Sequence, residues 1–397
     1  MSRILIFLFT FVALLSPLDQ LLAQEASNRT YLKMVEIQKL WEEERYGDAI
    51  VELENYATKT ADEPYDNAIV HQYIAHTYVF LDQIGNARKA LETAMAMPEL
   101  PLQLSAELNL IYGQIVLGDE QFELARDALE FWYLNSETEK LAGHVFALGY
   151  ANYMSGNLPR AEEMLYVALG TTEDPNDSWY RLYYQVLFEQ KKYAIAEEVL
   201  LGMLTRAPYK NDYWRLVANH HLQMENAEKA LAAITIAYNE GLLEGAEDLK
   251  RMIALYGMIE VPEKAARLLK QHLDTGEIES DADMLKRLGD LWLLSRERAK
   301  AKVVLEQAAE VAPDGNTYEM LGNIFFEDES WKSAHDSFIK AIEYGGLDEP
   351  ERIYLLAGIS AQRGGMKELA RAAFKEARKS DDLRRQADAL IKRLDRI

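Results

Sequence analysis

Apolar residues recur along the chain at helical spacing, and a small residue marks the same place in each recurrence. The small residues are Ala49, Ala87, Ala125, Ala161, Ala196, Ala230, Ala265, Ala301, Ala334 and Ala370. Successive members are 33 to 38 residues apart, and a period of this size is typical of proteins built from repeated supersecondary units. No alternating pattern of useful length indicates a strand. The pattern therefore predicts an all-α fold made of a stack of similar units.

The residues around each alanine recur with it. One copy reads Tyr318-x-x-Leu321-Gly322-x-x-Phe325, followed by Ala334-x-x-x-Phe338 and Ala341. Further copies read Leu285-x-x-Leu288-Gly289-x-x-Trp292 before Ala301, Val145-x-x-Leu148-Gly149 before Ala161, and Tyr354-x-x-x-Gly358 before Ala370-x-x-x-Phe374. This pattern resembles the tetratricopeptide repeat (TPR), in which W-x2-L-G-x2-Y precedes A-x3-F and P. The resemblance covers roughly residues 30–380 and implies a TPR α-solenoid, a right-handed superhelix of about ten helix hairpins.

The small residues at these positions have a physical explanation. Gly or Ala at the eighth position of the first helix, with Ala early in the second, lets two antiparallel helices approach closely. In weaker copies Ile37, Tyr184 and Ile253 occupy the eighth position. We expect looser packing at those hairpins.

The two ends of the chain differ from the repeats. Arg3 is followed by an uncharged apolar stretch of 12 residues, Ile4 to Leu15, and Ala23 is a small residue suited to a cleavage site. Twelve residues are too few for a membrane span, which needs about 20. We therefore expect a signal peptide at 1–23, a linker at 24–29, repeats at 30–380 and a C-terminal capping helix at 381–397. In that last helix Leu383, Ala387, Leu390 and Leu394 share one face.

A cleaved signal predicts a periplasmic protein with no stable membrane insertion. The alternative is an uncleaved N-terminus that anchors the protein to the inner membrane.

Charge is distributed unevenly. Residues 24–177 hold 27 acidic and 10 basic side chains, a net of −17, whereas residues 178–397 hold 37 and 32, a net of −5. One interpretation of the acidic half is solubility; the other is attraction of a basic partner segment. Nucleic-acid binding is not expected, because no basic patch is present to neutralise phosphates.

The resemblance implies where ligands bind. In TPR proteins they usually lie in a concave groove lined by the first helix of each hairpin, commonly at its second, fifth, ninth and twelfth residues. The fifth position reads Arg181, Arg215, Lys250 and Lys286 in four successive repeats. Asn219, one turn beyond Arg215, resembles part of a carboxylate-clamp TPR domain, although the rest of that clamp is not matched. These residues would form a groove for an acidic peptide segment or a terminal carboxylate.

In the first four repeats the groove region is more often apolar or aromatic, and it includes Met34, Trp41, Leu110, Phe146, Tyr150 and Tyr153. The alternative for this set is packing between repeats. The alternative for the cations is ion pairing within a helix, because Asp212, Glu247 and Asp283 each precede a cation by three residues.

No sequence motif points to catalysis. The chain lacks a Gly-rich phosphate loop, H-E-x-x-H and G-x-S-x-G, and it has no cysteine. His220 and His221 are adjacent, and adjacent helical residues point about 100° apart, so we expect no shared metal between them. We predict no enzymatic activity, no cofactor and no metal.

The most direct functional hypothesis is a periplasmic scaffold that binds protein or peptide partners. The signal peptide, the uninterrupted repeats and the segment Trp41-Glu42-Glu43-Glu44-Arg45-Tyr46-Gly47 resemble exported TPR proteins encoded beside the ExbB/ExbD/TonB energy-transduction genes. That resemblance implies an accessory role with those components. The alternative is a scaffold for exopolysaccharide export or cell-envelope assembly.

Overall fold

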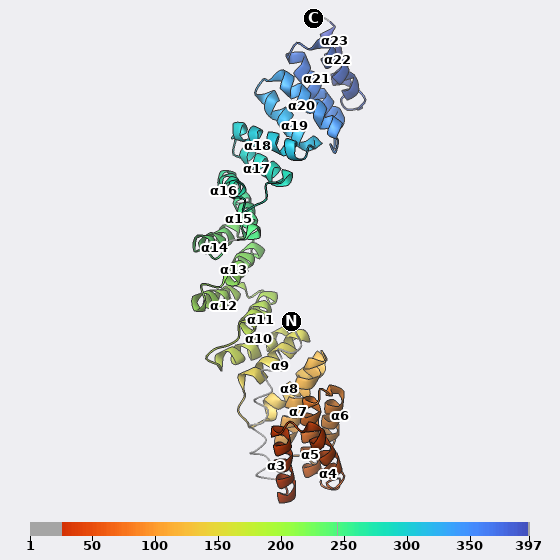
Figure 1. Cartoon of the computed structure of the whole chain (residues 1–397), viewed down its shortest axis with the longest axis vertical. Coiled ribbons are helices and arrows are strands. Elements are labelled where there is room, and N and C mark those ends of the chain that lie inside the picture. Colours follow the sequence, from red (N-terminus) through yellow and green to blue (C-terminus); the bar gives the residue numbers. More distant parts are fainter. Residues whose placement is uncertain (1–25, 244, 396–397) are drawn as a thin grey trace. The chain divides into compact units, whose positions relative to one another are not determined.

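The computed structural model describes residues 26–243 and 245–395, and every regular element among them is a helix (Figure 1). The chain divides into two compact units, with the boundary between Met203 and Leu204. The predicted signal segment 1–23 lies outside the described residues. Within the described ranges, no helix has the length and hydropathy needed to cross a membrane.

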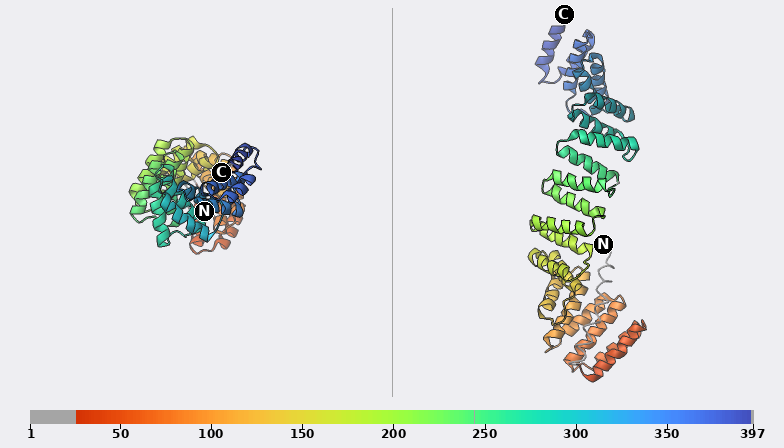
Figure 2. Two further views of the ribbon diagram at one scale, coloured as in Figure 1. Left: turned by 90° about the horizontal axis from the view of Figure 1, so that it is seen from above. Right: turned by 90° about the vertical axis from the view of Figure 1, so that its left-hand side faces the viewer.

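Unit 1 consists of antiparallel helix hairpins, each pairing an odd-numbered helix with the next even-numbered one. Its helices are α3 (Asn28–Glu42), α4 (Tyr46–Ala57), α5 (Pro64–Phe80), α6 (Ile84–Met95), α7 (Leu102–Gly118), α8 (Phe122–Asn135), α9 (Ala142–Met154), α10 (Leu158–Gly170), α11 (Asp177–Glu189) and α12 (Tyr193–Arg206), with the boundary inside α12. Figure 2 shows these pairs from the side. Helix α3 begins two residues before the repeat region expected from the sequence.

Unit 2 continues the same arrangement. Its helices are α13 (Asn211–Gln223), α14 (Ala227–Asn239), α15 (Ala246–Met258), α16 (Pro262–Thr275), α17 (Ala282–Leu294), α18 (Arg298–Val311), α19 (Gly315–Glu327), α20 (Trp331–Tyr344), α21 (Pro350–Arg363), α22 (Lys367–Ala377) and α23 (Arg384–Leu394). The described residues thus contain ten hairpins and one further helix, and the predicted all-α TPR solenoid fold is confirmed.

The recurring alanines lie at the centre of the hairpins. All ten, from Ala49 to Ala370, have no exposed surface. In several hairpins a glycine at the eighth position lies against the second helix. A Cβ added to Gly149 would lie 2.9 Å from Leu165 Cδ2, and one added to Gly322 would lie 2.6 Å from Phe338 Cδ1. The two helices of these hairpins therefore meet at a distance that only glycine permits.

Hairpins with a large residue at the eighth position pack less closely. The pairs α3–α4 and α15–α16, which carry Ile37 and Ile253 there, contact each other over fewer positions than the glycine-containing pairs α9–α10 and α19–α20. The looser packing predicted for these two hairpins is confirmed.

The turn inside each hairpin has a left-handed residue five positions before the alanine. In the α13–α14 turn this residue is Glu225, with φ of 56°. Its N–H donates to Leu222 O at 3.0 Å, and the following Asn226 N–H donates to His221 O at 2.8 Å. This is a Schellman arrangement. The equivalent residues in chain order are Glu44, Asp82, Glu120, Gly156, Lys191, Glu225, Glu260, Arg296, Glu329 and Gly365.

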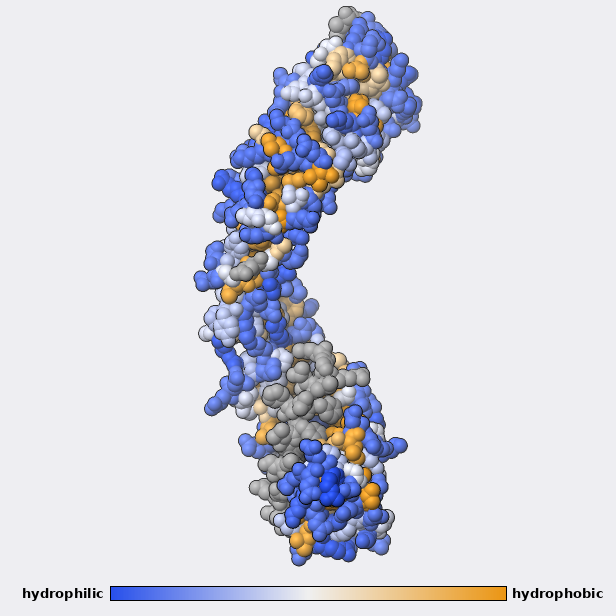
Figure 3. All heavy atoms as spheres, viewed as in Figure 1, coloured by the Kyte–Doolittle hydropathy of each residue, from blue (hydrophilic) through white to orange (hydrophobic). Residues whose placement is uncertain are grey.

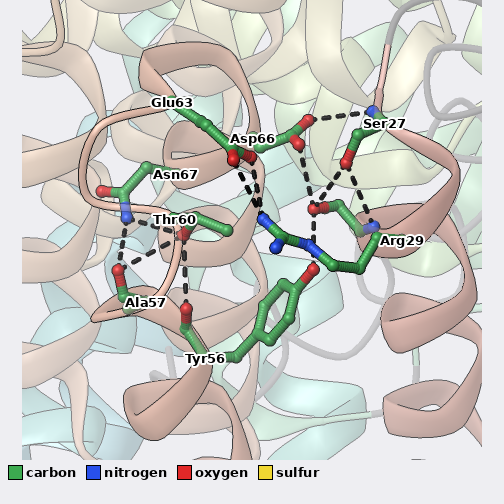
Figure 4. Close-up of polar contacts among 9 residues, drawn as sticks. Ser27, Arg29, Tyr56, Ala57, Thr60, Glu63, Asp66 and Asn67 are labelled. Carbon is green, nitrogen blue, oxygen red and sulfur yellow. Dashed lines mark hydrogen bonds and ion pairs between the residues drawn. The ribbon is translucent and has the colours of Figure 1, made fainter.

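A buried polar network holds the start of unit 1 (Figure 4). The Ser27 backbone N–H donates to Asp66 Oδ1 at 3.1 Å, and Thr30 Oγ1 donates to Asp66 Oδ2 at 3.1 Å. Thr30 Oγ1 also lies 3.0 Å from Tyr56 Oη. Burial alone would raise the pKa of Asp66, but the hydrogen bonds from Ser27 and Thr30 outweigh it, so the pKa lies below its ordinary value. The network ties the beginning of α3 to α4 and α5.

The last helix, α23, packs against α22 at the other end of the chain (Figure 1). Ala387 and Leu394 are buried, and Leu383 and Leu390 are half-buried. Arg378 pairs with Asp388 at 2.8 Å across the two helices. The apolar side of α23 thus covers the final hairpin.

Candidate peptide-binding surfaces

The aromatic residues expected at the groove of unit 1 lie between neighbouring repeats. Phe146 on α9 stacks on Trp179 of α11, with ring centroids 4.5 Å apart and planes 7° apart. Tyr150 meets Phe122 edge to face at 6.3 Å. Phe146 and Tyr150 are half-buried and pack against the core. They contribute to packing between repeats and keep part of each ring accessible.

Tyr153, at the end of α9, makes a polar contact with the next repeat. Its hydroxyl donates to Glu189 Oε1 at 2.8 Å. Burial and this hydrogen bond raise the pKa of Tyr153 to about 12. The phenol therefore stays protonated at neutral pH and remains a hydrogen-bond donor.

Arg215 is fixed by two carboxylates. It binds Asp248 in a bidentate manner, with Nε to Oδ1 at 3.0 Å and Nη2 to Oδ2 at 2.7 Å, and its Nη1 donates to Asp212 at 3.0 Å. The Asp248 side chain is only 8% exposed. The hydrogen bonds to Asp248 raise the pKa of Arg215. Arg215 therefore joins α13 to α15 and has few donors left for a ligand.

Lys250 and Lys286 are held more loosely. Lys250 pairs with Glu247 at 2.9 Å, and Lys286 pairs with Asp283 at 3.0 Å and with Asp314 at 3.4 Å. Glu247 and Asp283 are 86% and 80% exposed. The ion pairs within helices that the spacing indicated are therefore present for Arg215, Lys250 and Lys286.

Arg181 and Asn219 complete the predicted set. Arg181 is half-buried on α11 in unit 1, and Asn219 is exposed on α13 in unit 2. The structure thus distributes the eight predicted residues over the two units, with Phe146, Tyr150, Tyr153 and Arg181 in unit 1 and Arg215, Asn219, Lys250 and Lys286 in unit 2.

Sequence reasoning missed three residues that shape these surfaces. Trp179 is the stacking partner of Phe146, and Asp248 and Asp314 bind the cations of the preceding repeat. Asp248 and Asp314 lie near the start of the next hairpin's first helix, 33 and 28 residues after their partners. Comparing each repeat with the one that follows would have revealed these acids.

A polar depression of about 270 Å³ lies on unit 1 beside α8 and α10. It is lined by Arg126, Asp127, Glu130, Asn152, Asn157 and Arg160. Arg160 donates to Glu130 Oε1 at 2.6 Å and to Glu163 at 2.7 Å, and Arg126 pairs with Asp127. The two arginines of this depression are therefore already paired with carboxylates.

The expectation that His220 and His221 cannot face a common ligand is wrong. Both are buried on α13, their ring centroids lie 5.4 Å apart, and their nearest potential ligand atoms lie within 4.8 Å. Side-chain torsions bring the rings together although their Cβ atoms diverge.

Comparisons with known proteins return TPR proteins of low similarity. No protein-family model matches the chain, and no curated protein matches it. Among solved structures, YrrB, described as a TPR protein with an unusual peptide-binding site, is 18% identical over 46% of this chain and 91% of its own, with a TM-score of 0.39. A TPR protein from Parabacteroides merdae is 19% identical over 64% and 98%, with a TM-score of 0.34.

The TPR2AB domain of yeast Sti1, solved as a complex with pHSP90, is 17% identical over 64% of this chain and 98% of its own, with a TM-score of 0.34. At such scores, none of these proteins indicates what this chain binds. The fold assignment rests on the hairpins described above.

Proposed function

We propose that the protein is a non-catalytic scaffold that binds protein or peptide segments along the first helices of its hairpins. The observation that carries this proposal is that hairpins, their connecting loops and one capping helix account for all the described residues. Each hairpin buries one side against its neighbours, so consecutive first helices form an extended surface for a long segment.

The two units would bind segments of different chemical character. In unit 1 the half-buried rings of Phe146, Tyr150 and Tyr153 suit apolar side chains. In unit 2 Lys250 and Lys286 pair with the exposed acids Glu247 and Asp283, and each of these two ion pairs is worth at most about 1 kcal/mol. An acidic segment can therefore replace those partners. Arg215 is different, because releasing Asp248 would leave a buried carboxylate uncompensated.

The cellular role proposed here follows from the sequence. The segment 1–23 would direct export to the periplasm, where the scaffold would serve as an accessory component of the ExbB/ExbD/TonB energy-transduction system. The alternative is a scaffold for exopolysaccharide export or envelope assembly. Export is checked by the mass of the mature protein: cleavage after Ala23 supports it, whereas an intact N-terminus in the membrane fraction supports the anchored alternative.

The binding role is tested by crosslinking the tagged full chain in cells of the source organism and identifying captured envelope proteins. We expect ExbB, ExbD or TonB to be enriched. The variant K250E/K286E should capture at least about threefold less partner than the parent, because it reverses the charge of two weakly held cations. The control K264E/K332E makes the same charge change at exposed positions on the second helices α16 and α20.

Capture of secretin or polysaccharide-synthase components alone would contradict the energy-transduction role and support the alternative. Equal capture by K250E/K286E and the control would show that Lys250 and Lys286 are not used. The aromatic surface of unit 1 would then be the remaining binding surface.

A further inference from the structure

The outer face of the capping helix α23 is basic, and no other described element covers it. Arg385 and Lys392 are both exposed, seven residues apart. Two helical turns separate them by about 10.5 Å on one side of the helix. The buried Ala387 and Leu394 each lie two positions further on, so they face the opposite side, toward α22. The apolar side of α23 is covered, and the cationic side faces solvent.

The cations of this face differ from others nearby. Arg371, Arg378 and Arg384 pair with Asp395, Asp388 and Asp381, respectively. Arg385, Lys392 and Arg393, in contrast, have no ion-pair partner among the residues that the structure describes. Their charge is therefore available to an external partner.

The end of the chain is positive although the protein is acidic. Residues 367–397 hold 10 basic and 6 acidic side chains, a net of +4. Residues 26–203 hold 13 basic and 29 acidic side chains, a net of −16, and residues 204–366 hold 19 and 28, a net of −9. Two copies of the chain repel each other in most orientations. An approach that brings the basic end of one copy to unit 1 of another is attractive.

Unit 1 presents acids at a matching spacing. Glu44 and Asp82 are the exposed left-handed residues of the first two hairpin turns. The first helices of these hairpins, α3 and α5, contact each other, and packed helices lie about 8–10 Å apart. The two acidic turns are therefore separated by about the distance between Arg385 and Lys392.

We propose that the outer face of α23 docks on the acidic turns of unit 1 in a second copy of this chain, giving head-to-tail association. Such a contact joins two different surfaces, so further copies can add to either end. An anionic membrane is less favoured, because the apolar side of α23 is packed on α22 and is not available for insertion. The association is distinct from the proposed peptide binding, since it uses neither groove.

Sedimentation velocity of the mature chain over a concentration series tests this inference. We expect concentration-dependent association at low ionic strength that disappears near 0.5 M NaCl, where charges are screened within a few ångströms. R385E/K392E should raise the dissociation constant by at least about tenfold, equivalent to about 1.4 kcal/mol. The control K264E/K332E, with the same net charge, should leave it unchanged.

A charge exchange makes the test specific. E44K/D82K should also abolish self-association, and a mixture of E44K/D82K with R385E/K392E should associate again. Lysine is tolerated at such turns, as Lys191 shows with φ of 60°. A chain that is monomeric at every concentration and salt would overturn the inference, as would equal association of the parent and R385E/K392E. Binding to phosphatidylglycerol-rich vesicles that requires Arg385 and Lys392, without self-association, would overturn it in favour of a membrane surface.

Discussion

At the scale of the residue, the hairpin turns carry an unusual conformational cost. Eight of the ten left-handed turn residues are not glycine, and six of the eight are acidic. A residue with a Cβ in the left-handed region costs about 1–2 kcal/mol. The Schellman hydrogen bonds hold these turns closed in spite of that cost.

We therefore expect Glu260→Gly to stabilise unit 2. Glu260 has φ of 57° and is exposed. The gain should be about 0.5–1 kcal/mol, because the larger conformational freedom of glycine in the unfolded chain offsets part of the relief. Urea unfolding measures the difference. The reverse change Gly365→Glu, at φ of 74°, should cost a similar amount; a loss of stability in Glu260→Gly would contradict this account.

A buried histidine should make the stability of unit 1 depend on pH. His144 is 3% exposed and meets Trp132 edge to face at 5.6 Å. Burial lowers its pKa to about 4, below the unfolded value of about 6.5. The unfolded chain therefore binds the proton more readily, so stability is full above pH 6.5 and falls as the pH drops toward 4.

His144→Phe keeps an aromatic ring and removes the titrating group. The free energy of unfolding decreases between pH 7 and pH 4.5 in both proteins. The decrease should be smaller in the variant than in the parent by about 1–2 kcal/mol. Comparing the two slopes cancels the carboxylates, which titrate in both proteins. Parallel stability curves for parent and variant would show that His144 does not contribute to the pH dependence.

At the scale of the element, the close packing of a hairpin depends on the absence of a Cβ atom at one position of its first helix. Gly322 lies against Phe338, which is fully buried. An added methyl group cannot be accommodated by the ring without moving α19 away from α20. Overpacking of this kind costs about 1–3 kcal/mol and exceeds the helix propensity gained, which is up to about 1 kcal/mol.

Gly322→Ala should therefore destabilise unit 2 by about 1–2 kcal/mol. Gly257→Ala in α15 is the matched control, because nothing lies within 4 Å of its added Cβ. It should stabilise the same unit by up to about 1 kcal/mol. Thermal and urea unfolding give both values. If the two substitutions changed the stability in the same direction, close packing at Gly322 would be excluded as the cause of its effect.

The elements that the sequence predicted are those whose signal lies within one repeat. Ala334, Gly322 and Phe338 stand at fixed separations, and Gly322 lies against Phe338, so their spacing alone indicated the hairpin. The turn residues gave no such signal, because Glu and Asp replace the glycine that usually marks a left-handed position. Their conformation is imposed by the two helices that the turn connects.

The candidate binding surface was only partly predictable for a related reason. The spacing of Asp212 and Arg215 indicated a pair within one helix, and that pair is present. The stronger partner, Asp248, belongs to the next repeat, and its approach depends on how successive hairpins stack. The same holds for Trp179 against Phe146. A pattern within each repeat does not specify contacts between repeats.

At the scale of the whole molecule, charge is the property that differs most between the units. Unit 1 has a net of −16 over residues 26–203, whereas residues 204–397 hold 29 basic and 34 acidic side chains, a net of −5. Hydrophilic residues cover most of the face shown in Figure 3, and apolar residues appear in small patches. The like charges of unit 1 repel one another, and this repulsion opposes its compact state.

Salt should therefore stabilise unit 1 more than unit 2. Raising NaCl from about 0.05 to about 0.5 M shortens the screening length from more than 10 Å to less than 5 Å and weakens the repulsion among the surface acids. Exposed ion pairs are weakened too, but each is worth at most about 1 kcal/mol. Unit 2, where charges nearly balance, loses about as much attraction as repulsion.

Hydrogen–deuterium exchange read by mass spectrometry follows both units in one intact chain. Amides of α5–α10 should exchange more slowly at the higher salt, while those of α15–α20 should change little. R385E/K392E, measured in parallel, separates this effect from self-association, because the added acids lie outside unit 1. If both units respond equally to salt, the net charge of unit 1 does not limit its stability, and the acidic side chains serve solubility or partner attraction alone.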